Sequence, residues 1–371
     1  MKFTYVFATG RQSRIDSDVP HATEMFYGFE QISKKYRDSE IIELHDHQKL
    51  INKVYLIIDK VINKLTKLPF NMNSVTSKEN YKKIVKSDYL IISIDRLAIS
   101  LLPIILLSKL RRKNINISFF VMGLLDKKKL NKLQELFSKK ILIILFKSVN
   151  NIIFLGEEEY NIANKLFDQY SLKFHFLPFM VDFEFWKNDD ESKQKSGILF
   201  VGNDSNREFD KVIQIATILK QINFTIISKY YRINKIDINL PNVEIIDGSW
   251  GNQKLTDGEL RDYYTKSKLV IIPLKESNQP SGQSVALQSM TTKTPVMITK
   301  TSGFWDKTSF SHLENVVLIE NNSIDNWIRK INEIYSDELM LKKLADNAFI
   351  TIKKSYTDDL FFKKLLKILK I

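Results

Sequence analysis

Short apolar runs recur along the whole sequence, and each is continuous rather than alternating with polar residues. Continuous runs of this length are typical of parallel strands that are covered on both faces. Stretches of helical length separate them. The sequence therefore predicts an α/β fold of two Rossmann-like, doubly wound domains that face each other across a cleft. The predicted strands are 2–8, 40–44, 89–93, 117–122, 151–156, 173–178, 197–202, 224–228, 243–247, 269–274, 295–299 and 316–320.

The chain length of 371 residues exceeds what one core ordinarily serves, so two domains are expected. The charged segment 186–196 contains no aliphatic side chain and precedes a new strand, which makes it the expected linker. We therefore expect a first domain over 1–185 and a second over 197–356. A C-terminal helix over 357–371 is able to pack back on the first domain.

Several classes of protein are disfavoured by what the sequence lacks. There is no Cys, so neither a disulfide nor a thiolate metal site is expected. The apolar stretch 97–107 spans 11 residues and contains Pro103, whereas a membrane-spanning helix needs about 20 residues. We interpret the N-terminal residues as a strand and not as a secretory signal. No GxxxxGK occurs, so a P-loop is not expected.

Positive charge is concentrated in one part of the sequence. The net charge is +13, and residues 101–150 hold eleven Lys or Arg against two acids, a local excess of nine. Nucleic acid, an anionic membrane surface, a phosphorylated substrate or simply a solvated face would each suit this excess. Segment 126–147 is amphipathic, with Leu133, Leu136 and Phe137 on one face. We expect that face to pack on the sheet and only the Lys side chains to touch a membrane.

A Pro-Ser-Gly turn joins the predicted strand 269–274 to a helix that begins near Gln283. Gly282 allows the backbone to approach a ligand closely. The first N–H groups of the helix, at Gln283 and Ser284, would form a site for phosphate. The alternative is an ordinary turn in which Ser281 is the N-cap.

A second polar loop follows the strand 197–202 and contains Arg207. A guanidinium at the start of the next helix would bind diphosphate oxygens with two hydrogen bonds. Together with the start of the 283 helix it would clamp a diphosphate. The alternative is a surface pair with Glu208 or Asp210.

The first loop, 8–28, is long and polar, and it lacks the GxGxxG fingerprint. Gly10, Arg11 and Arg14 are expected to line the cleft. His21 is a candidate proton shuttle or hydroxyl contact, although a lone His more often has a structural role or lies on the surface.

A further loop follows the strand 243–247. Asp247 and Trp250 lie there. This region would face a nucleobase, while core packing is the alternative role for the Trp.

The run from 197 to 306 resembles the donor-binding half of the retaining glycosyltransferases of family four, which have the GT-B fold. The resemblance rests on ILFVGNDSNREFDKVIQIA, LRDYYTKSKLVIIPL, QPSGQSVALQSMTTKTPVMIT and SGFWD, with LPFMVDFEFW resembling the segment that joins the two domains. The resemblance implies an N-terminal acceptor-binding domain and a C-terminal domain that binds a nucleotide sugar.

The resemblance also implies roles for individual residues. The donor phosphates would contact Arg207, Lys211 and the turn at Gly282, Gln283 and Ser284. The family usually carries two Glu seven residues apart, one for the donor sugar and one for the ribose hydroxyls. Here those positions are Pro280 and Gln288, a PSGQS variant without either carboxylate.

Other side chains would then complete the site. Gln288 and Ser281 are expected at the ribose and sugar, with Glu276 as a candidate for the missing carboxylate. The loop 122–128 lacks the His that the family often has there, which leaves His21 and Glu24 as the candidate catalytic residues.

We therefore expect a metal-independent hexosyltransferase that moves a sugar from a nucleoside-diphosphate sugar, such as a UDP-sugar, to a glycan or lipid-linked acceptor with retention of configuration. No cofactor is expected. We expect a cytoplasmic protein with peripheral contact to the inner membrane surface. An inactive nucleotide-sugar-binding scaffold is the alternative. A basic nucleic-acid-binding protein is disfavoured, because Phe and Tyr lie in strand-like runs and not among the basic residues.

Overall fold

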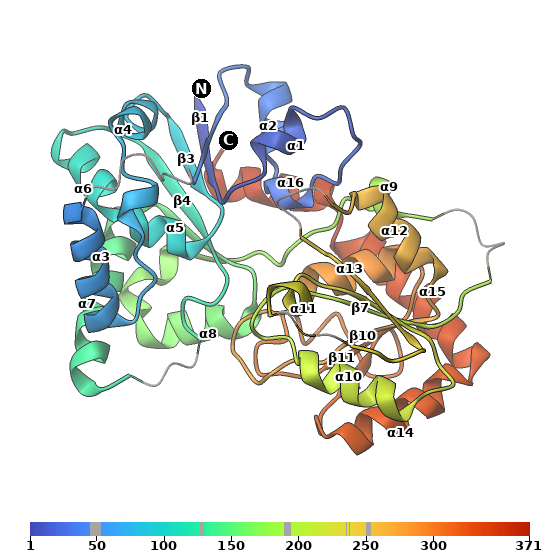
Figure 1. Ribbon diagram of the computed structural model, residues 1–371. Coiled ribbons are helices and arrows are strands. Elements are labelled where there is room, and N and C mark those ends of the chain that lie inside the picture. Colours follow the sequence, from blue (N-terminus) through green and yellow to red (C-terminus); the bar gives the residue numbers. More distant parts are fainter. Residues whose placement is uncertain (45–52, 127–129, 189–193, 235, 237, 250–253) are drawn as a thin grey trace. The chain divides into compact units, whose positions relative to one another are not determined.

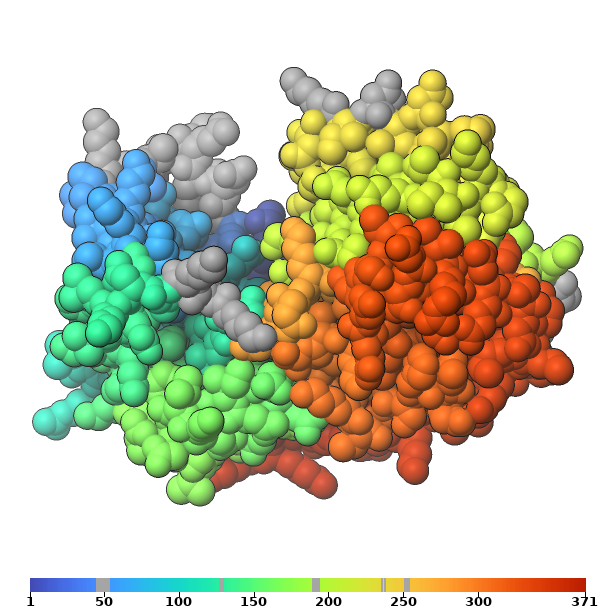
Figure 2. Space-filling model, turned by 90° about the horizontal axis from the view of Figure 1, so that it is seen from below, coloured from blue at the N-terminus to red at the C-terminus, as the bar shows by residue number. Residues whose placement is uncertain are grey.

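A computed structural model describes residues 1–44, 53–126, 130–188, 194–234, 236, 238–249 and 254–371 (Figure 1). The chain divides into two compact units. The first unit comprises Met1–Ser17, Phe26–Leu177 and Phe362–Ile371. The second comprises Asp18–Met25 and Pro178–Phe361. In Figure 2 most of the surface of the first unit runs from blue to green, and that of the second from yellow-green to red.

The first unit is built on a parallel sheet of six strands in the order β2-β1-β3-β4-β5-β6. The order reverses between β1 and β3, whose register pairs Val6 with Ile92. Helices cover both faces of the sheet (Figure 1), which explains why the strands are continuously apolar. The strands are β1 (Phe3–Phe7), β2 (Glu40–Glu43), β3 (Tyr89–Ile92), β4 (Asn116–Val121), β5 (Asn151–Phe154) and β6 (Phe174–Phe176).

The helices of the first unit include two that are described in detail below, α3 (Lys53–Thr66) and α7 (Lys132–Ser148). A capping box at Asn131 and Gln134 begins α7. The other helices are α1 (Gln12–Ile15), α2 (Phe29–Lys35), α4 (Lys78–Ile84), α5 (Asp95–Ser100), α6 (Leu102–Leu110), α8 (Glu157–Leu166) and the part of α16 (Asp358–Leu369) from Phe362.

The second unit has its own parallel sheet of six strands, in the order β12-β11-β10-β7-β8-β9. Its strand order reverses between β7 and β10. In open parallel sheets, ligands bind beyond the carboxyl ends of the strands at such a reversal. The strands are β7 (Ile198–Val201), β8 (Phe224–Ile227), β9 (Val243–Ile246), β10 (Leu269–Ile272), β11 (Val296–Thr299) and β12 (Val317–Ile319).

The helices of the second unit surround this sheet (Figure 1). Trp327 and Ile331 of α14 are fully buried in its core, as are Phe200 of β7 and Leu344 of α15. The helices are α9 (Phe183–Trp186), α10 (Phe209–Ile218), α11 (Tyr230–Ile233), α12 (Asp257–Lys266), α13 (Gln283–Thr291), α14 (Ile324–Tyr335) and α15 (Glu338–Ser355).

All twelve apolar runs form the predicted strands, and the α/β fold class is confirmed. One expectation about a helix face is wrong. Leu133, Leu136 and Phe137 of α7 do not pack on the sheet, because their exposed fractions are 56%, 50% and 37%. The sheet-facing side of α7 is formed instead by Leu142, Leu145 and their neighbours. Among the described residues, no helix combines the length and apolar character needed to cross a bilayer.

Candidate functional site

The candidate site is a cavity of about 240 Å³ in the second unit. Residues that follow the ends of β7, β8 and β9 line it, together with the start of α13. It therefore lies where the strand order of this sheet reverses. The residues around it that carry polar groups are Glu24, Asn203, Asp204, Arg207, Ser249, Asp257, Ser284 and Gln288.

Arg207 is held at this cavity by the backbone around it. An isolated antiparallel bridge joins Arg207 to Leu274, just beyond β10, and the next residue's N–H, at Glu208, donates to Pro273 O (3.1 Å). The side chain is 3% exposed. Because α10 begins at Phe209, Arg207 precedes the helix and is not on its outer face. The alternative of a surface pair with Glu208 or Asp210 is therefore wrong.

Two glycines make room for the guanidinium. A Cβ built on Gly202 would lie 2.2 Å from Arg207 Nε, and one built on Gly282 would lie 3.2 Å from Arg207 Nη1. Any larger residue at 202 would collide with the Arg side chain. Gly202 and Gly282, on the two loops that the sequence singled out, thus flank the same cation.

The guanidinium is buried without its full set of hydrogen-bond partners. Among the described residues, neither Nε nor Nη1 of Arg207 has a hydrogen-bond acceptor. Asp204 Oδ2 lies 3.5 Å from Nε and forms an ion pair there. A buried, under-bonded cation is costly in a folded protein, so its retention in a cavity suggests that a ligand supplies the acceptors.

The start of α13 forms another part of the cavity wall. Gly282 is the N-cap, with φ of 82° in the left-handed region, and no side chain caps the helix. Ser284 and Val285 line the cavity. The first turn of a helix carries N–H groups without intrahelical acceptors and a partial positive charge. The alternative in which Ser281 caps the helix is wrong, because Ser281 Oγ accepts from Asn206 Nδ2 (2.8 Å).

Glu24 reaches the cavity from far away in the sequence. Segment Asp18–Met25 belongs to the second unit, and Glu24 is 1% exposed there. Its Oε1 accepts from Trp186 Nε1 (2.9 Å) and Gln288 Nε2 (2.8 Å). Burial raises the pKa of Glu24 to about 8, and the nearby carboxylates Asp257 and Asp182 act in the same direction. With this pKa, the carboxyl group of Glu24 is neutral at pH 7.

Gln288 is tied into the protein at both ends of its amide. Tyr264 donates its hydroxyl to Gln288 Oε1 (3.0 Å), while Nε2 donates to Glu24. The chain of hydrogen bonds from Trp186 through Glu24 and Gln288 to Tyr264 fixes the amide orientation. An amide oxygen has two lone pairs, so Oε1 retains one for a ligand hydroxyl.

Part of the loop predicted to face a nucleobase lines the cavity. Gly248 and Ser249 line it, and Asn203 Nδ2 donates to Gly248 O (2.7 Å). Asp247 does not line the cavity. It pairs with Arg232 Nε (2.8 Å) and Lys254. The hydrogen bond from Ser249 is the main reason that the pKa of Asp247 is lowered. Trp250 lies outside the described residues.

Several expected donor contacts lie away from this cavity. Lys211 forms an ion pair with Glu208 and donates to the carbonyl of Asn322. Glu276 accepts from Ser302 N (3.2 Å). Gln283 is buried within α13. Ser281, which bonds Asn206, is also outside the lining. The structure therefore gathers Arg207, Ser284, Gln288 and Glu24 but not these four residues.

The remaining first-loop candidates are divided between the units. His21 belongs to the second unit, where its Nδ1 lies 3.4 Å from Val19 O, and it does not line the cavity. Gly10, Arg11 and Arg14 belong to the first unit.

Near the end of β1, Arg11 Nη1 donates to Thr9 O (3.3 Å), and the backbone N–H groups of Arg11 and Gln12 donate to Glu43. Gly10 has φ of 100°, and Arg14 is buried. Burial lowers the pKa of Arg11.

Sequence reasoning missed Asn203, Asp204 and Ser249 in the lining, and also Asp257 and Tyr264. Asp257 lines the cavity and accepts from Ala22 N (3.0 Å), which ties the first-loop segment to α12. Tyr264 is fully buried beside Gln288. Both residues lie in the segment 256–268, where the capping box gave a signal for a helix but not for contacts. The described residues hold no group of three or more His, Asp or Glu arranged to bind a metal.

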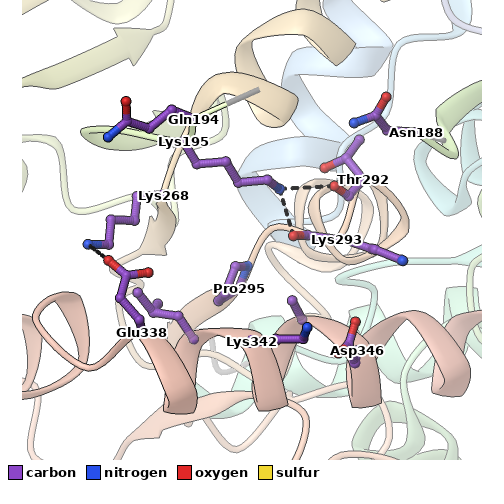
Figure 3. Close-up of a pocket in the computed structure, with 12 residues that line it drawn as sticks. Asn188, Gln194, Lys195, Lys268, Thr292, Lys293, Pro295, Glu338, Lys342 and Asp346 are labelled. Atoms are coloured by element: carbon purple, nitrogen blue, oxygen red, sulfur yellow. Dashed lines mark hydrogen bonds and ion pairs between the residues drawn. The ribbon is translucent and has the colours of Figure 1, made fainter. Parts of the chain in front are cut away.

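A larger cavity in the second unit, of about 490 Å³, is rich in Lys (Figure 3). Two of its Lys side chains, Lys195 and Lys268, are engaged by the protein. Lys195 Nζ donates to the carbonyls of Thr292 (3.2 Å) and Lys293 (2.7 Å) at the end of α13, and Lys268 pairs with Glu338 (2.5 Å). Ammonium groups at a helix C-terminus complement the helix dipole. We therefore assign Lys195 to capping α13 and not to a ligand.

Comparison with solved structures places this arrangement in a known fold. HepE from Anabaena in complex with UDP matches with a TM-score of 0.66 at 11% identity, over 100% of both chains. HepE in complex with UDP-glucose matches similarly, with a TM-score of 0.66 at 12% identity over 100% of this chain and 99% of that one. Sucrose-phosphate synthase from Thermosynechococcus elongatus matches at 0.68 and 11% identity, over 100% of this chain and 98% of that one.

A third protein is similar in structure over the whole of this chain. A glycosyltransferase from Rickettsia africae matches at 0.64 and 12% identity, over 100% of this chain and 97% of that one. These likenesses confirm the GT-B fold, with two parallel six-stranded sheets. Neither a protein-family model nor a curated protein matches the sequence.

Proposed function

We propose that the chain is a glycosyltransferase whose second unit binds a nucleoside-diphosphate sugar in the 240 Å³ cavity. The observation that carries this proposal is the buried guanidinium of Arg207, which lies between Gly202 and Gly282 with Nε and Nη1 free of hydrogen-bond acceptors among the described residues. A diphosphate supplies such acceptors in the right number and with the opposite charge.

The diphosphate lies between Arg207 and the first turn of α13 in this proposal. Sugar transfer passes through a transition state that resembles an oxocarbenium ion, while negative charge grows on the departing diphosphate. The guanidinium and the N–H groups at the start of α13 stabilise that charge, and they do so without a metal ion. The cavity is smaller than a typical site for a whole ligand, so it accommodates the diphosphate end of the donor.

Glu24 and Gln288 have supporting roles in this proposal. A neutral Glu24 carboxyl group does not repel a diphosphate, whereas a carboxylate at the same place would. Glu24 holds the amide of Gln288, and Gln288 offers its remaining lone pair to a ribose hydroxyl. We therefore assign Glu24 to positioning Gln288, and not to proton transfer.

The finer properties rest on the likeness of sequence and fold. HepE, which matches the whole chain, was solved with UDP and with UDP-glucose, and this supports a UDP-sugar as donor. Retention of configuration follows the resemblance of 197–306 to retaining enzymes. A glycan or lipid-linked molecule is the proposed acceptor.

A second candidate function is a nucleotide-sugar-binding scaffold without turnover. Pro280 and Gln288 stand where the resemblance implies two carboxylates, and Glu276, the expected replacement for the missing carboxylate, does not line the cavity. The scaffold binds the same donor, so only turnover distinguishes it from the transferase.

Thermal unfolding with UDP, GDP, ADP, CMP and dTDP tests the donor site. We expect one nucleotide to raise the midpoint, because a ligand at about 100 times its Kd adds about 2.7 kcal/mol to the free energy of unfolding. The sugar conjugates of that nucleotide are then incubated with the protein. Release of the nucleoside diphosphate supports the transferase, and binding without release supports the scaffold. No response to any nucleotide would refute both.

A further inference from the structure

Helix α3 of the first unit turns its apolar side outward. Its large aliphatic side chains follow a spacing of three and four residues, which places them in one stripe along the helix. Ile57 is 62% exposed and Val61 is 50% exposed. An amphipathic helix on a globular domain ordinarily buries this stripe. The stripe consists of Val54, Ile57, Ile58, Val61 and Leu65.

The side of α3 that faces the protein packs Tyr55 and Ile62 on the core and also carries polar groups that form hydrogen bonds there. Asp59 is 5% exposed, and its Oδ1 accepts from Met72 N (3.0 Å). Asn63 bonds both backbone groups of Phe70, donating to its carbonyl (2.9 Å) and accepting from its N–H (2.7 Å). These bonds hold the segment that follows α3. They fix the rotation of the helix about its axis, so the outward stripe is part of the fold.

Helix α7 continues the apolar surface. It packs beside α3 (Figure 1), where Gln134 Nε2 donates to the carbonyl of Lys64 (3.1 Å). Its exposed stripe has the same spacing as that of α3, with Leu133 56% and Leu136 50% exposed. The members of this stripe are Leu133, Leu136, Phe137 and Ile144. We call the two stripes together the α3–α7 face.

The charges on these two helices have one predominant sign. Six exposed Lys lie on α3 and α7 beside the stripes. Among the described residues of these two helices, Glu135 is an exposed acid and Asp59 is buried. The exposed Lys are Lys60, Lys64, Lys132, Lys139, Lys140 and Lys147. Aliphatic side chains bordered by ammonium groups match the acyl chains and anionic headgroups of a bilayer surface.

We propose that the α3–α7 face docks the protein on an anionic lipid bilayer. The aliphatic stripes enter the boundary between headgroups and acyl chains, and the Lys side chains contact the headgroup phosphates. A second copy of the chain fits this face less well. A symmetric dimer places the same patch on both subunits, so the Lys of one copy would oppose the Lys of the other. This inference does not depend on the donor-site proposal.

Sedimentation with lipid vesicles tests the proposal, using the full chain and vesicles of phosphatidylcholine with or without phosphatidylglycerol. We expect binding only when phosphatidylglycerol is present, and weaker binding as salt is raised. Ile57→Ser with Val61→Ser should lower the partition coefficient at least about tenfold. Lys139→Gln with Lys140→Gln should lower it about fivefold for each Lys removed.

Leu339→Ser is the matched control, because Leu339 is 84% exposed on α15 in the second unit. This variant should bind vesicles as the unaltered chain does. All variants change exposed residues and should keep the thermal midpoint. Absence of vesicle binding would overturn the proposal, and so would binding that Ile57→Ser with Val61→Ser leaves unchanged. A dimer that this double variant dissociates, without vesicle binding, would assign the face to self-association.

Discussion

Two buried side chains of the candidate site, Arg207 and Glu24, differ in whether they are charged. Arg207 brings a buried guanidinium to the cavity, where Asp204 pairs with its Nε and the remaining N–H groups can bind an anion. Glu24 can become neutral, and burial shifts its pKa in that direction. At pH 7 Glu24 therefore adds no carboxylate charge beside the guanidinium of Arg207.

The stability of the fold should depend on the proton of Glu24. Its folded pKa, about 8, lies above the ordinary value of 4.5, so the folded state retains a proton that the unfolded chain releases. The stabilisation is complete below about pH 4.5 and is lost as the pH rises through about 8. Between pH 5 and pH 9, the free energy of unfolding should fall less for Glu24→Gln than for the unaltered chain. Urea unfolding at each pH measures this difference.

Glu259→Gln is the control for this pH dependence. Glu259 lies in the capping box of α12, and hydrogen bonds from Thr256 lower its pKa, so its contribution belongs to acidic pH. This variant should keep the alkaline slope of the unaltered chain. Parallel curves for Glu24→Gln and the unaltered chain would mean that Glu24 is ionised in the folded state.

Single residues differ in how well the sequence foretold them. Arg207 was predicted at the site because it lies in the polar loop between the strand 197–202 and the next helix, and the structure places it at the cavity. Lys211 is four residues further on, within the first turn of α10, and its ammonium group is held by Glu208 and Asn322. From their spacing in the sequence, Arg207 and Lys211 both place a basic side chain near the loop. The backbone bridge between Arg207 and Leu274 distinguishes the two residues.

At the scale of elements, the junction between β10 and α13 depends on its glycine. Gly282→Ala should destabilise the protein by about 1–3 kcal/mol, because φ is 82° and the new Cβ would lie 2.9 Å from Ile272 Cγ2. Urea unfolding measures the loss. The same change should weaken nucleotide binding, since Arg207 Nη1 must move.

Gly258 offers a matched substitution. It lies in α12, and an added Cβ would meet only Thr256 Oγ1, at 3.9 Å. Gly258→Ala should therefore leave stability unchanged or raise it by up to about 1 kcal/mol. Equal losses for the two variants would show that the strain at position 282 is absent.

The elements themselves were predictable for a physical reason. A parallel strand covered on both faces must be apolar throughout, and each of the twelve runs predicted as strands is a strand. The face of a helix is harder to assign. A spacing of three and four residues shows that α3 and α7 have apolar stripes but not what covers them, and the stripe of α7 was therefore assigned to the wrong side.

At the scale of the whole molecule, each unit is completed by a segment from the other half of the sequence. Asp18–Met25 belongs to the second unit, and Phe362–Ile371 belongs to the first. Glu24 thus bonds Gln288 across 264 residues of sequence. The sequence could nominate Glu24 as a polar residue of a long loop, but its partner could not be predicted, because no local spacing links two such distant positions.

Titration calorimetry with UDP, on the unaltered chain, Arg207→Gln and Lys211→Gln, tests the central claim most directly. Hydrogen bonds to a charged group contribute about 1.5–3 kcal/mol, so Arg207→Gln should weaken UDP binding by about tenfold to a hundredfold. It should not lower the thermal midpoint without ligand, because it removes a buried charge whose Nε and Nη1 lack hydrogen-bond acceptors among the described residues. Lys211→Gln should leave the affinity nearly unchanged. Unchanged affinity in Arg207→Gln, or a larger loss in Lys211→Gln, would contradict the assignment of the diphosphate to this cavity.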